Sequence, residues 1–305
     1  MNKIKIWISA FRLRTLPLSV SGIILGASFA YYNGYFDGLV FFLAILTTLV
    51  YQILSNLAND YGDGAKGTYN NERIGPKRAI QSKTITLQEM EEAIKVNVLL
   101  AIVLSFSLIF TAFGSSNVIH ALLFFILSGV AIYSSLRYTV GDNAYGYKGK
   151  GDIFVFIFFG LVSVIGSYFL FAQTIDHVVL LPAISIGLLS AGVLNLNNIR
   201  DIKSDKKSNK ITLAVKLGYD KAKRYHLTLV ISALVLGLIF SLLYYTSIYN
   251  FLFLLAYIPI VKHILRIKGY TEPKQFDSEL KILALSTFAF AILLGLGQIL
   301  HVILM

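Results

Sequence analysis

Residues 38–63, GLVFFLAILTTLVYQILSNLANDYGD, join an uncharged hydrophobic stretch directly to two aspartates. Residues 38–59 carry no charged side chain and are long enough to cross a bilayer as a helix, which requires about 20 apolar residues. Carboxylates at the end of such a helix are costly unless they face a cavity and hold a ligand. The stretch therefore predicts a membrane protein with a functional site at a helix end.

The composition of the whole chain is also that of a membrane protein. Of its 305 residues, 56% are hydrophobic and 14% are charged, and the mean hydropathy is +0.70. The absence of cysteine excludes disulfides and thiolate metal sites. The net charge of +11 is explained by basic residues that collect on the cytoplasmic side of a membrane, so we expect no nucleic-acid partner. The first fifteen residues lack a cleavable signal pattern and are typical of an interfacial amphipathic helix.

The uncharged stretches predict an all-α, polytopic protein with one domain over residues 1–305. We place nine transmembrane helices at 15–36, 38–59, 89–112, 118–137, 153–173, 178–200, 224–244, 248–266 and 281–304. The alternate loops near 33–38, 113–117, 174–177 and 245–250 contain no Lys or Arg, although the chain has 27 of them. By the positive-inside rule, the N-terminus is cytoplasmic, and chemistry on a polar substrate would take place on the cytoplasmic side of the cell membrane.

The first polar motif follows the second predicted span. Asn56, Asn59, Asp60 and Asp63 have the spacing of one helix face. Carboxylate and amide oxygens are ligands that Mg²⁺ prefers, and Mg²⁺ commonly completes its shell with water and phosphate oxygens. The basic residues that follow can contact phosphate oxygens, and they include Lys66, Arg73 and Arg78. The alternative is an ordinary solvated loop, but acidic residues at a helix C-terminus oppose the helix dipole and require compensation.

A second motif of the same kind follows the sixth predicted span. Asn198, Asp201 and Asp205 stand at i, i+3 and i+7, again before a run of lysines. A basic inner loop would explain the lysines but not the asparagines at the end of a membrane span. Two such motifs predict two Mg²⁺ ions that together hold a diphosphate and stabilise it as a leaving group.

Four blocks of this sequence resemble the UbiA superfamily of intramembrane aromatic prenyltransferases. They are Arg14 to Pro17, Asn56 to Arg78, Tyr147 to Gly160 and Asn195 to Gly218. The Asp motifs are shared across the superfamily, whereas ERIGPKR (72–78) and GDIFVFIFFG (151–160) resemble its naphthoate branch. That branch often has a further Asp shortly after the position of Gly67, where this chain has Tyr69 and Asn70.

The resemblance implies a UbiA-like bundle and a role for each matching residue. Metal binding and catalysis would fall to Asp60, Asp63, Asp201 and Asp205. Diphosphate binding would involve Asn56, Asn59, Lys66, Arg73, Arg78, Asn198, Arg200 and Lys207. Arg14, Arg137 and Tyr138 are open to either a site role or an anchoring role, and Asp152 to a role near the acceptor or to capping of a helix N-terminus. The Phe-rich run 154–159 is open to packing or to lining a prenyl tunnel. The five histidines have no ligand spacing, and we expect them to be structural.

The reaction that the resemblance implies is Mg²⁺-dependent transfer of a long-chain polyprenyl group to 1,4-dihydroxy-2-naphthoate. The aromatic ring would attack an allylic carbocation and lose carbon dioxide, giving demethylmenaquinol in menaquinone biosynthesis. The partners would be these two substrates and the bilayer, with no obligate protein partner. The alternatives are a sister enzyme that prenylates 4-hydroxybenzoate or haem and, from a different class, a membrane transporter.

Overall fold

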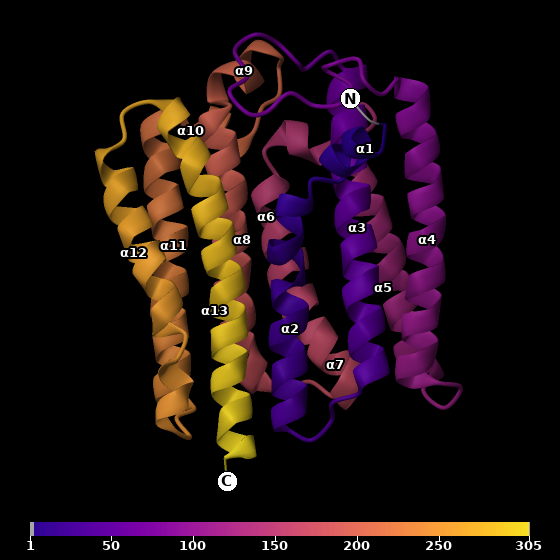
Figure 1. Cartoon of the computed structure of the whole chain (residues 1–305), viewed down its shortest axis with the longest axis vertical. Coiled ribbons are helices and arrows are strands. Elements are labelled where there is room, and N and C mark those ends of the chain that lie inside the picture. The colour runs from indigo at the N-terminus through magenta and orange to yellow at the C-terminus, as the bar shows by residue number, and fades with distance from the viewer. Residues whose placement is uncertain (1–2, 305) are drawn as a thin grey trace.

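The computed structural model describes residues 3–304 and shows a bundle of long, roughly parallel helices (Figure 1). Within the described residues there is no strand, and nine helical segments are long and apolar enough to cross a membrane. This confirms the predicted all-α, nine-span architecture. The spans are formed by α2 (Leu16–Tyr32), α3 (Gly38–Ala65), α4 (Leu87–Phe113), α5 (Val118–Arg137), the segment from α6 (Gly151–Val155) to α7 (Ser167–Ala172), α8 (Leu180–Arg200), α11 (Tyr219–Leu243), α12 (Leu254–Gly269) and α13 (Asp277–Ile303).

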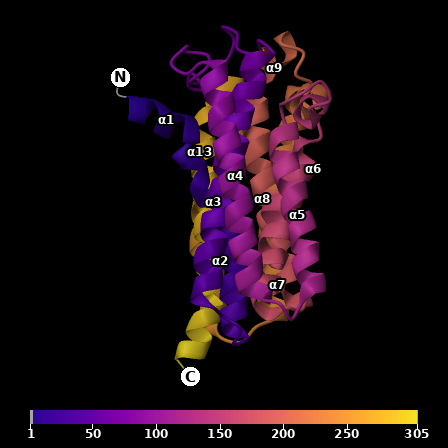
Figure 2. The same cartoon turned by 90° about the vertical axis from the view of Figure 1, so that its right-hand side faces the viewer.

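One end of the bundle, here called the polar end, carries the long connections. These are the loop 66–86, the short helices α9 (Ile202–Lys207) and α10 (Leu213–Leu217), and the N-terminal helix α1 (Lys3–Phe11). The C-terminus lies at the opposite end (Figure 1). Figure 2 shows α1 projecting sideways from the bundle at the polar end, as expected for a helix that lies along a membrane surface.

Helix α3 is longer than the sequence predicts. It begins where the Asp37 side chain accepts hydrogen bonds from the backbone N–H groups of Leu39 and Val40. It continues through the first motif to Ala65, six residues beyond the predicted end at residue 59. Asp60 and Asp63 therefore lie within a continuous helix, and their side-chain directions are fixed by the helix geometry.

The fifth span is not a regular α-helix. Residues Phe156–Gly166 form a π-helical segment between α6 and α7, which the sequence analysis did not predict. Close packing surrounds this segment: a Cβ added to Gly26 of α2 would lie 2.0 Å from Ser167 Oγ, and one on Gly160 would lie 2.6 Å from Gly187 Cα of α8. Small residues thus let α2 and α8 approach the fifth span closely, as is common between membrane helices.

Candidate active site

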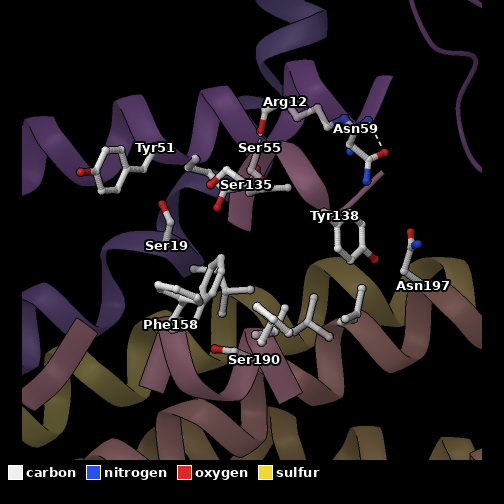
Figure 3. Close-up of a pocket in the computed structure, with 18 of the residues that line it drawn as sticks. Arg12, Ser19, Tyr51, Ser55, Asn59, Ser135, Tyr138, Phe158, Ser190 and Asn197 are labelled. Carbon is white, nitrogen blue, oxygen red and sulfur yellow. Dashed lines mark hydrogen bonds between the residues drawn. The ribbon is translucent and has the colours of Figure 1, made fainter. Parts of the chain in front are cut away.

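The two polar motifs line one cavity of about 760 Å³ that extends from the polar end, here called its mouth, into the bundle. The first motif contributes Asn59 and Asp63 from α3, and the second contributes Asn198, Asp201 and Asp205 from the end of α8 and from α9. Figure 3 shows Arg12 hydrogen-bonded to Asn59 at this end of the cavity. Tyr138 and Asn197 are also turned toward the cavity. Residues nearly 150 positions apart in the sequence therefore share one vestibule.

Asp63 is held by two partners from other parts of the chain. The Tyr147 hydroxyl donates to its Oδ1 at 2.8 Å, and Lys210 Nζ donates to Oδ1 at 3.0 Å and to Oδ2 at 2.9 Å. Burial alone would lower the pKa of Lys210, but the charges of Asp63 and Asp205 outweigh burial and raise it. Lys210 is therefore a cation, and its ion pair ties the first motif to the segment that follows the second.

Asp60 faces a different environment from Asp63. Its carboxylate accepts hydrogen bonds from the Tyr69 hydroxyl and, at 3.1 Å, from the backbone N–H of Ala79. Burial, and then the nearby charge of Asp60, raise the pKa of Tyr69, so the phenol remains a neutral donor. Asp60 is buried but does not line the cavity. Through its hydrogen bonds it holds the loop 66–86 at two points, Tyr69 near its start and Ala79 further along.

Asp201 forms a buried ion pair with its neighbour in the sequence. Arg200 Nε donates to Oδ1 at 3.1 Å and Nη2 to Oδ2 at 2.6 Å, while the same guanidinium also contacts Asn197 and Asp277. Burial would raise the pKa of Asp201, but the pairing with Arg200 lowers it below its ordinary value. Arg200 is 1% exposed, so its hydrogen-bonding capacity is largely used within the protein.

Asp205 is the least satisfied carboxylate of the two motifs. It lines the cavity, and its carboxylate receives no hydrogen bond from the part of the chain that the structure describes. Burial, opposed by the charge of Lys210, raises its pKa to about 7. A buried carboxylate without a donor is a ready ligand for a cation.

The predicted basic residues divide into two groups. Arg73 and Arg78 line the cavity, and Arg73 also stacks over the Tyr69 ring at 5.7 Å. Burial, and then the charges of Arg12 and Arg73, lower the pKa of Arg78 well below its usual value. Lys66 instead donates to the carbonyl oxygens of Thr139 and Gly141, each at 2.8 Å, and stays outside the cavity.

Two further predicted residues also lie away from the cavity lining. Lys207 is exposed and its Nζ lies 4.0 Å from Glu72. Asn56 donates to the carbonyl oxygen of Phe11 at 2.9 Å and to Thr15 at 3.1 Å, which fastens the α1–α2 junction to α3. Of the twelve predicted site residues, the structure therefore does not bring Asn56, Asp60, Lys66 and Lys207 to the cavity.

The structure adds residues that sequence reasoning did not select. Arg12 has a left-handed backbone (φ 52°) and reaches from the end of α1 to Asn59 Oδ1 at 3.3 Å. Tyr147 and Lys210 hold Asp63, and Asp277 of α13 pairs with Arg200. Lys210 belongs to the basic run after the second motif, but nothing in the sequence separates it from Lys203, Lys206 and Lys207.

The inner part of the cavity is apolar and aromatic, with hydroxyl groups between the rings. Phe158 and Ser190 point into it in Figure 3. Phe154 and Phe159 of the Phe-rich run line it as well, and Phe154 stacks on Tyr145 at 3.9 Å between ring centroids. Of the residues left open by the sequence, Arg14 and Tyr138 line the cavity, whereas Arg137 and Asp152 do not. The five histidines, expected to be structural, also lie outside the cavity lining.

The donor set suits Mg²⁺ rather than a softer metal. The cavity mouth presents carboxylate and amide oxygens from Asp63, Asp201, Asp205, Asn59 and Asn198, with no sulfur or imidazole. Within the described residues, no three acidic or histidine side chains are already gathered around one point. The unpaired Asp205 and its oxygen-rich surroundings fit a cation that takes part of its shell from a phosphate-bearing ligand.

The fold and the cavity define an intramembrane protein with an amphiphilic internal site, polar and charged at its mouth and apolar within. Residues 19–286 match the UbiA prenyltransferase family, and the chain belongs to that family. Both the predicted fold class and the resemblance are thereby confirmed.

Among its relatives, the chain is 42% identical over 273 residues to the 1,4-dihydroxy-2-naphthoate octaprenyltransferase of Escherichia coli (strain K12), covering 90% of this chain and 88% of that protein. It is 39% identical over 298 residues to the protein of the same name from Haemophilus influenzae, covering 97% and 96%. Its fold is similar to that of a UbiA homolog from Archaeoglobus fulgidus bound to GPP and Mg²⁺, with a TM-score of 0.62 and 14% identity over 93% of this chain and 99% of that one. Mg²⁺ is thus a ligand found within this family.

Proposed function

We propose that this protein transfers a long-chain polyprenyl group from polyprenyl diphosphate to 1,4-dihydroxy-2-naphthoate, in menaquinone biosynthesis. The observation that carries the proposal is the single cavity, which joins an arginine- and aspartate-lined mouth to an apolar, aromatic interior. A prenyl diphosphate has the same division between an anionic head and an apolar tail. The names of the relatives at 42% and 39% identity support the naphthoate as acceptor.

The diphosphate head is assigned to the mouth of the cavity. Arg12, Arg73 and Arg78 supply planar guanidinium groups that match phosphate oxygens. Asp63, Asp201 and Asp205 would hold two Mg²⁺ ions, whose chemistry when bound is to neutralise the diphosphate so that it leaves readily. Asp60 is assigned to positioning, because its carboxylate already binds Tyr69 and Ala79.

The reacting carbon is assigned to the aromatic zone just inside the mouth. Tyr138 lines the cavity and lies close enough to Asp63 that burial, together with this charge, raises its pKa. The rings of Tyr138, Tyr145, Phe154 and Phe158 can stabilise a passing allylic carbocation through their faces. The acceptor ring attacks the allylic carbon, the carbon–oxygen bond to diphosphate breaks, and the carboxyl group leaves as carbon dioxide.

The location of the reaction follows from the same arrangement. The protein is an integral, multi-pass membrane protein. We place it in the cytoplasmic membrane with the polar end, and so the cavity mouth, on the cytoplasmic side, because the lysines and arginines concentrate in the connections at that end.

Product analysis tests the proposal directly. Purified protein is given Mg²⁺ and a polyprenyl diphosphate with dihydroxynaphthoate or 4-hydroxybenzoate in separate reactions, and the products are identified by mass spectrometry. We expect a product only from the naphthoate, with the mass of the acceptor plus the prenyl group minus carbon dioxide and one hydrogen. A product from 4-hydroxybenzoate alone would assign the sister activity, and no consumption of the diphosphate would favour a transporter.

A matched pair of variants links the activity to the cavity. Asp63→Asn should abolish product formation, whereas Asp142→Asn should not, because Asp142 is an exposed loop residue that does not line the cavity. Equal activity of the two variants would contradict the assignment of the site.

A further inference from the structure

Two of the three motif carboxylates that line the cavity already have a cationic partner supplied by the chain itself. Lys210 contacts both oxygens of Asp63, and Arg200 contacts both oxygens of Asp201. These cations contact the same carboxylate oxygens that would coordinate a divalent ion. A bare metal ion that enters the cavity must therefore compete with them.

The charge of the whole cavity disfavours a bare cation as well. Its described lining has seven basic and four acidic side chains, an excess of three formal positive charges. The basic residues are Arg12, Arg14, Arg73, Arg78, Arg200, Lys210 and Lys281, and the acidic residues are Asp63, Asp201, Asp205 and Asp277. In a partly desolvated site such an excess repels Mg²⁺ and attracts a diphosphate.

The two internal cations differ in how firmly they are held. Arg200 is 1% exposed and is shared among Asn197, Asp201 and Asp277, so moving it would break several charge-assisted bonds. Lys210 has a flexible four-carbon stem, and its side-chain hydrogen bonds go to Asp63 alone. Its backbone N–H is fixed to the Asp205 carbonyl oxygen at 2.9 Å, so the ammonium can move without displacing the chain.

We propose that Lys210 is an exchangeable counter-ion of Asp63, and that Mg²⁺ binds this site only together with a diphosphate. When the metal–diphosphate unit arrives, the Lys210 ammonium leaves Asp63 and contacts diphosphate oxygens, while Tyr147 keeps its hydrogen bond to Asp63. Asp63 and the unpaired Asp205 then become available as ligands. This inference rests on the proposed function, since it takes the substrate head to be a diphosphate, and it adds a role for Lys210 and an order of binding.

Binding measurements without turnover test the exchange. The purified full-length protein in detergent is titrated with Mg²⁺ alone, with inorganic pyrophosphate alone, and with both, and the shift in thermal unfolding temperature is recorded. For the wild type we expect little shift with Mg²⁺ alone and a large shift with both. Mg²⁺ alone should bind about tenfold more tightly to Lys210→Met than to the wild type, because a competing positive charge is gone. The further increase in unfolding temperature when pyrophosphate is added to Mg²⁺ should be smaller than in the wild type.

Matched variants separate this effect from a general change of charge or stability. Lys206→Met removes the same charge from an exposed position on α9, close to Lys210 in the sequence, and should behave as the wild type. Lys210→Met leaves Asp63 partly unpaired, so this variant should be less stable than the wild type in the absence of ligands. The double variant Asp63→Asn/Lys210→Met removes both charges. It should regain stability relative to Lys210→Met but show no increase in Mg²⁺ affinity, and it therefore serves as the folded reference.

The possible results are distinct. Saturable Mg²⁺ binding to the wild type without pyrophosphate, with the same affinity in Lys210→Met, would overturn the exchange while leaving the prenyl-transfer proposal in place. If no combination of Mg²⁺ and pyrophosphate stabilises the wild type, both proposals fail, and product analysis would show it independently.

Discussion

Replacing Tyr69 with Phe tests whether Asp60 anchors the loop 66–86 rather than binding metal. The change removes the hydroxyl that donates to Asp60 but keeps the ring over which Arg73 stacks. A hydrogen bond to a charged group contributes about 1.5–3 kcal/mol, so the loop should open about 10- to 150-fold more often. The Ala79 N–H, which bonds the other Asp60 oxygen at 3.1 Å, should be exposed to solvent by the same opening.

Hydrogen–deuterium exchange measures this opening. Peptides that contain Ala79 should exchange faster in Tyr69→Phe by the same factor, with no change in helices remote from the loop, such as α12. The KM for the prenyl diphosphate should rise more than kcat falls, because Arg73 and Arg78 lie on this loop and line the cavity.

The control is Tyr61→Phe, since the Tyr61 hydroxyl has no hydrogen bond within residues 3–304. Two results together would refute the reasoning and return Asp60 to the metal ligands. The first is unchanged hydrogen–deuterium exchange at Ala79 in Tyr69→Phe. The second is a loss of kcat and of Mg²⁺ dependence in Asp60→Asn as large as the loss in Asp63→Asn.

Four other outcomes follow from the structure. Asp63→Asn should lower kcat/KM by at least about 100-fold in a prenyl-transfer assay, because both Lys210 and the proposed metal depend on this carboxylate. Since burial raises the pKa of Asp205 to about 7, a proton competes with the metal below that pH. The affinity for Mg²⁺ plus pyrophosphate is measured by thermal shift, and the ratio of the wild-type affinity to that of Asp205→Asn should fall about tenfold per pH unit below 7 and level off above it, because protonation of pyrophosphate itself cancels in the ratio. The same raised pKa means that the ligand-free fold loses stability as the pH rises from about 4 through 7, a trend that Asp205→Asn should also remove. Gly26→Ala should lower the free energy of unfolding by about 1–3 kcal/mol, because the new Cβ would lie 2.0 Å from Ser167 Oγ and 2.5 Å from the Val164 carbonyl oxygen, whereas Gly129→Ala, which meets no atom within 4 Å, should leave stability nearly unchanged in the same denaturation experiment.

The spans were predictable because each requires a long uncharged stretch, a property that depends only on local composition. Their polar ends were less predictable. Helix α3 continues through Asp60 and Asp63 to Ala65, and an uncharged-stretch criterion necessarily stops at residue 59. The π-helical segment Phe156–Gly166 lies against closely approaching neighbours such as Gly187, and this packing is not encoded in the local pattern.

The first motif shows what helical spacing can and cannot resolve. At 3.6 residues per turn, the centre of the pair Asn56 and Asp60 lies about 60° around the helix from the centre of the pair Asn59 and Asp63, so all four fall on one broad face. The structure divides that face: Asn59 and Asp63 line the cavity, whereas Asn56 and Asp60 bind the α1–α2 junction and the loop 66–86. Lys210 and Tyr147 could not be assigned from the sequence, because their role depends on contacts with a residue 147 and 84 positions away, respectively.

The division within α3 explains why two acidic residues three positions apart have different requirements. Asp60 needs fixed donors, because its role is to hold the arginine-bearing loop over the cavity, and a neutral phenol and a backbone N–H provide them. As a proposed metal ligand, Asp63 needs a partner that can be exchanged, because a permanently neutralised carboxylate cannot bind a metal and an unpaired one would be costly to bury. A lysine on a flexible stem meets both conditions, and the Tyr69 hydroxyl adds a donor to the anchor at Asp60. On the proposed roles, the motif combines on a single helix one carboxylate that fixes structure and one that is available for chemistry.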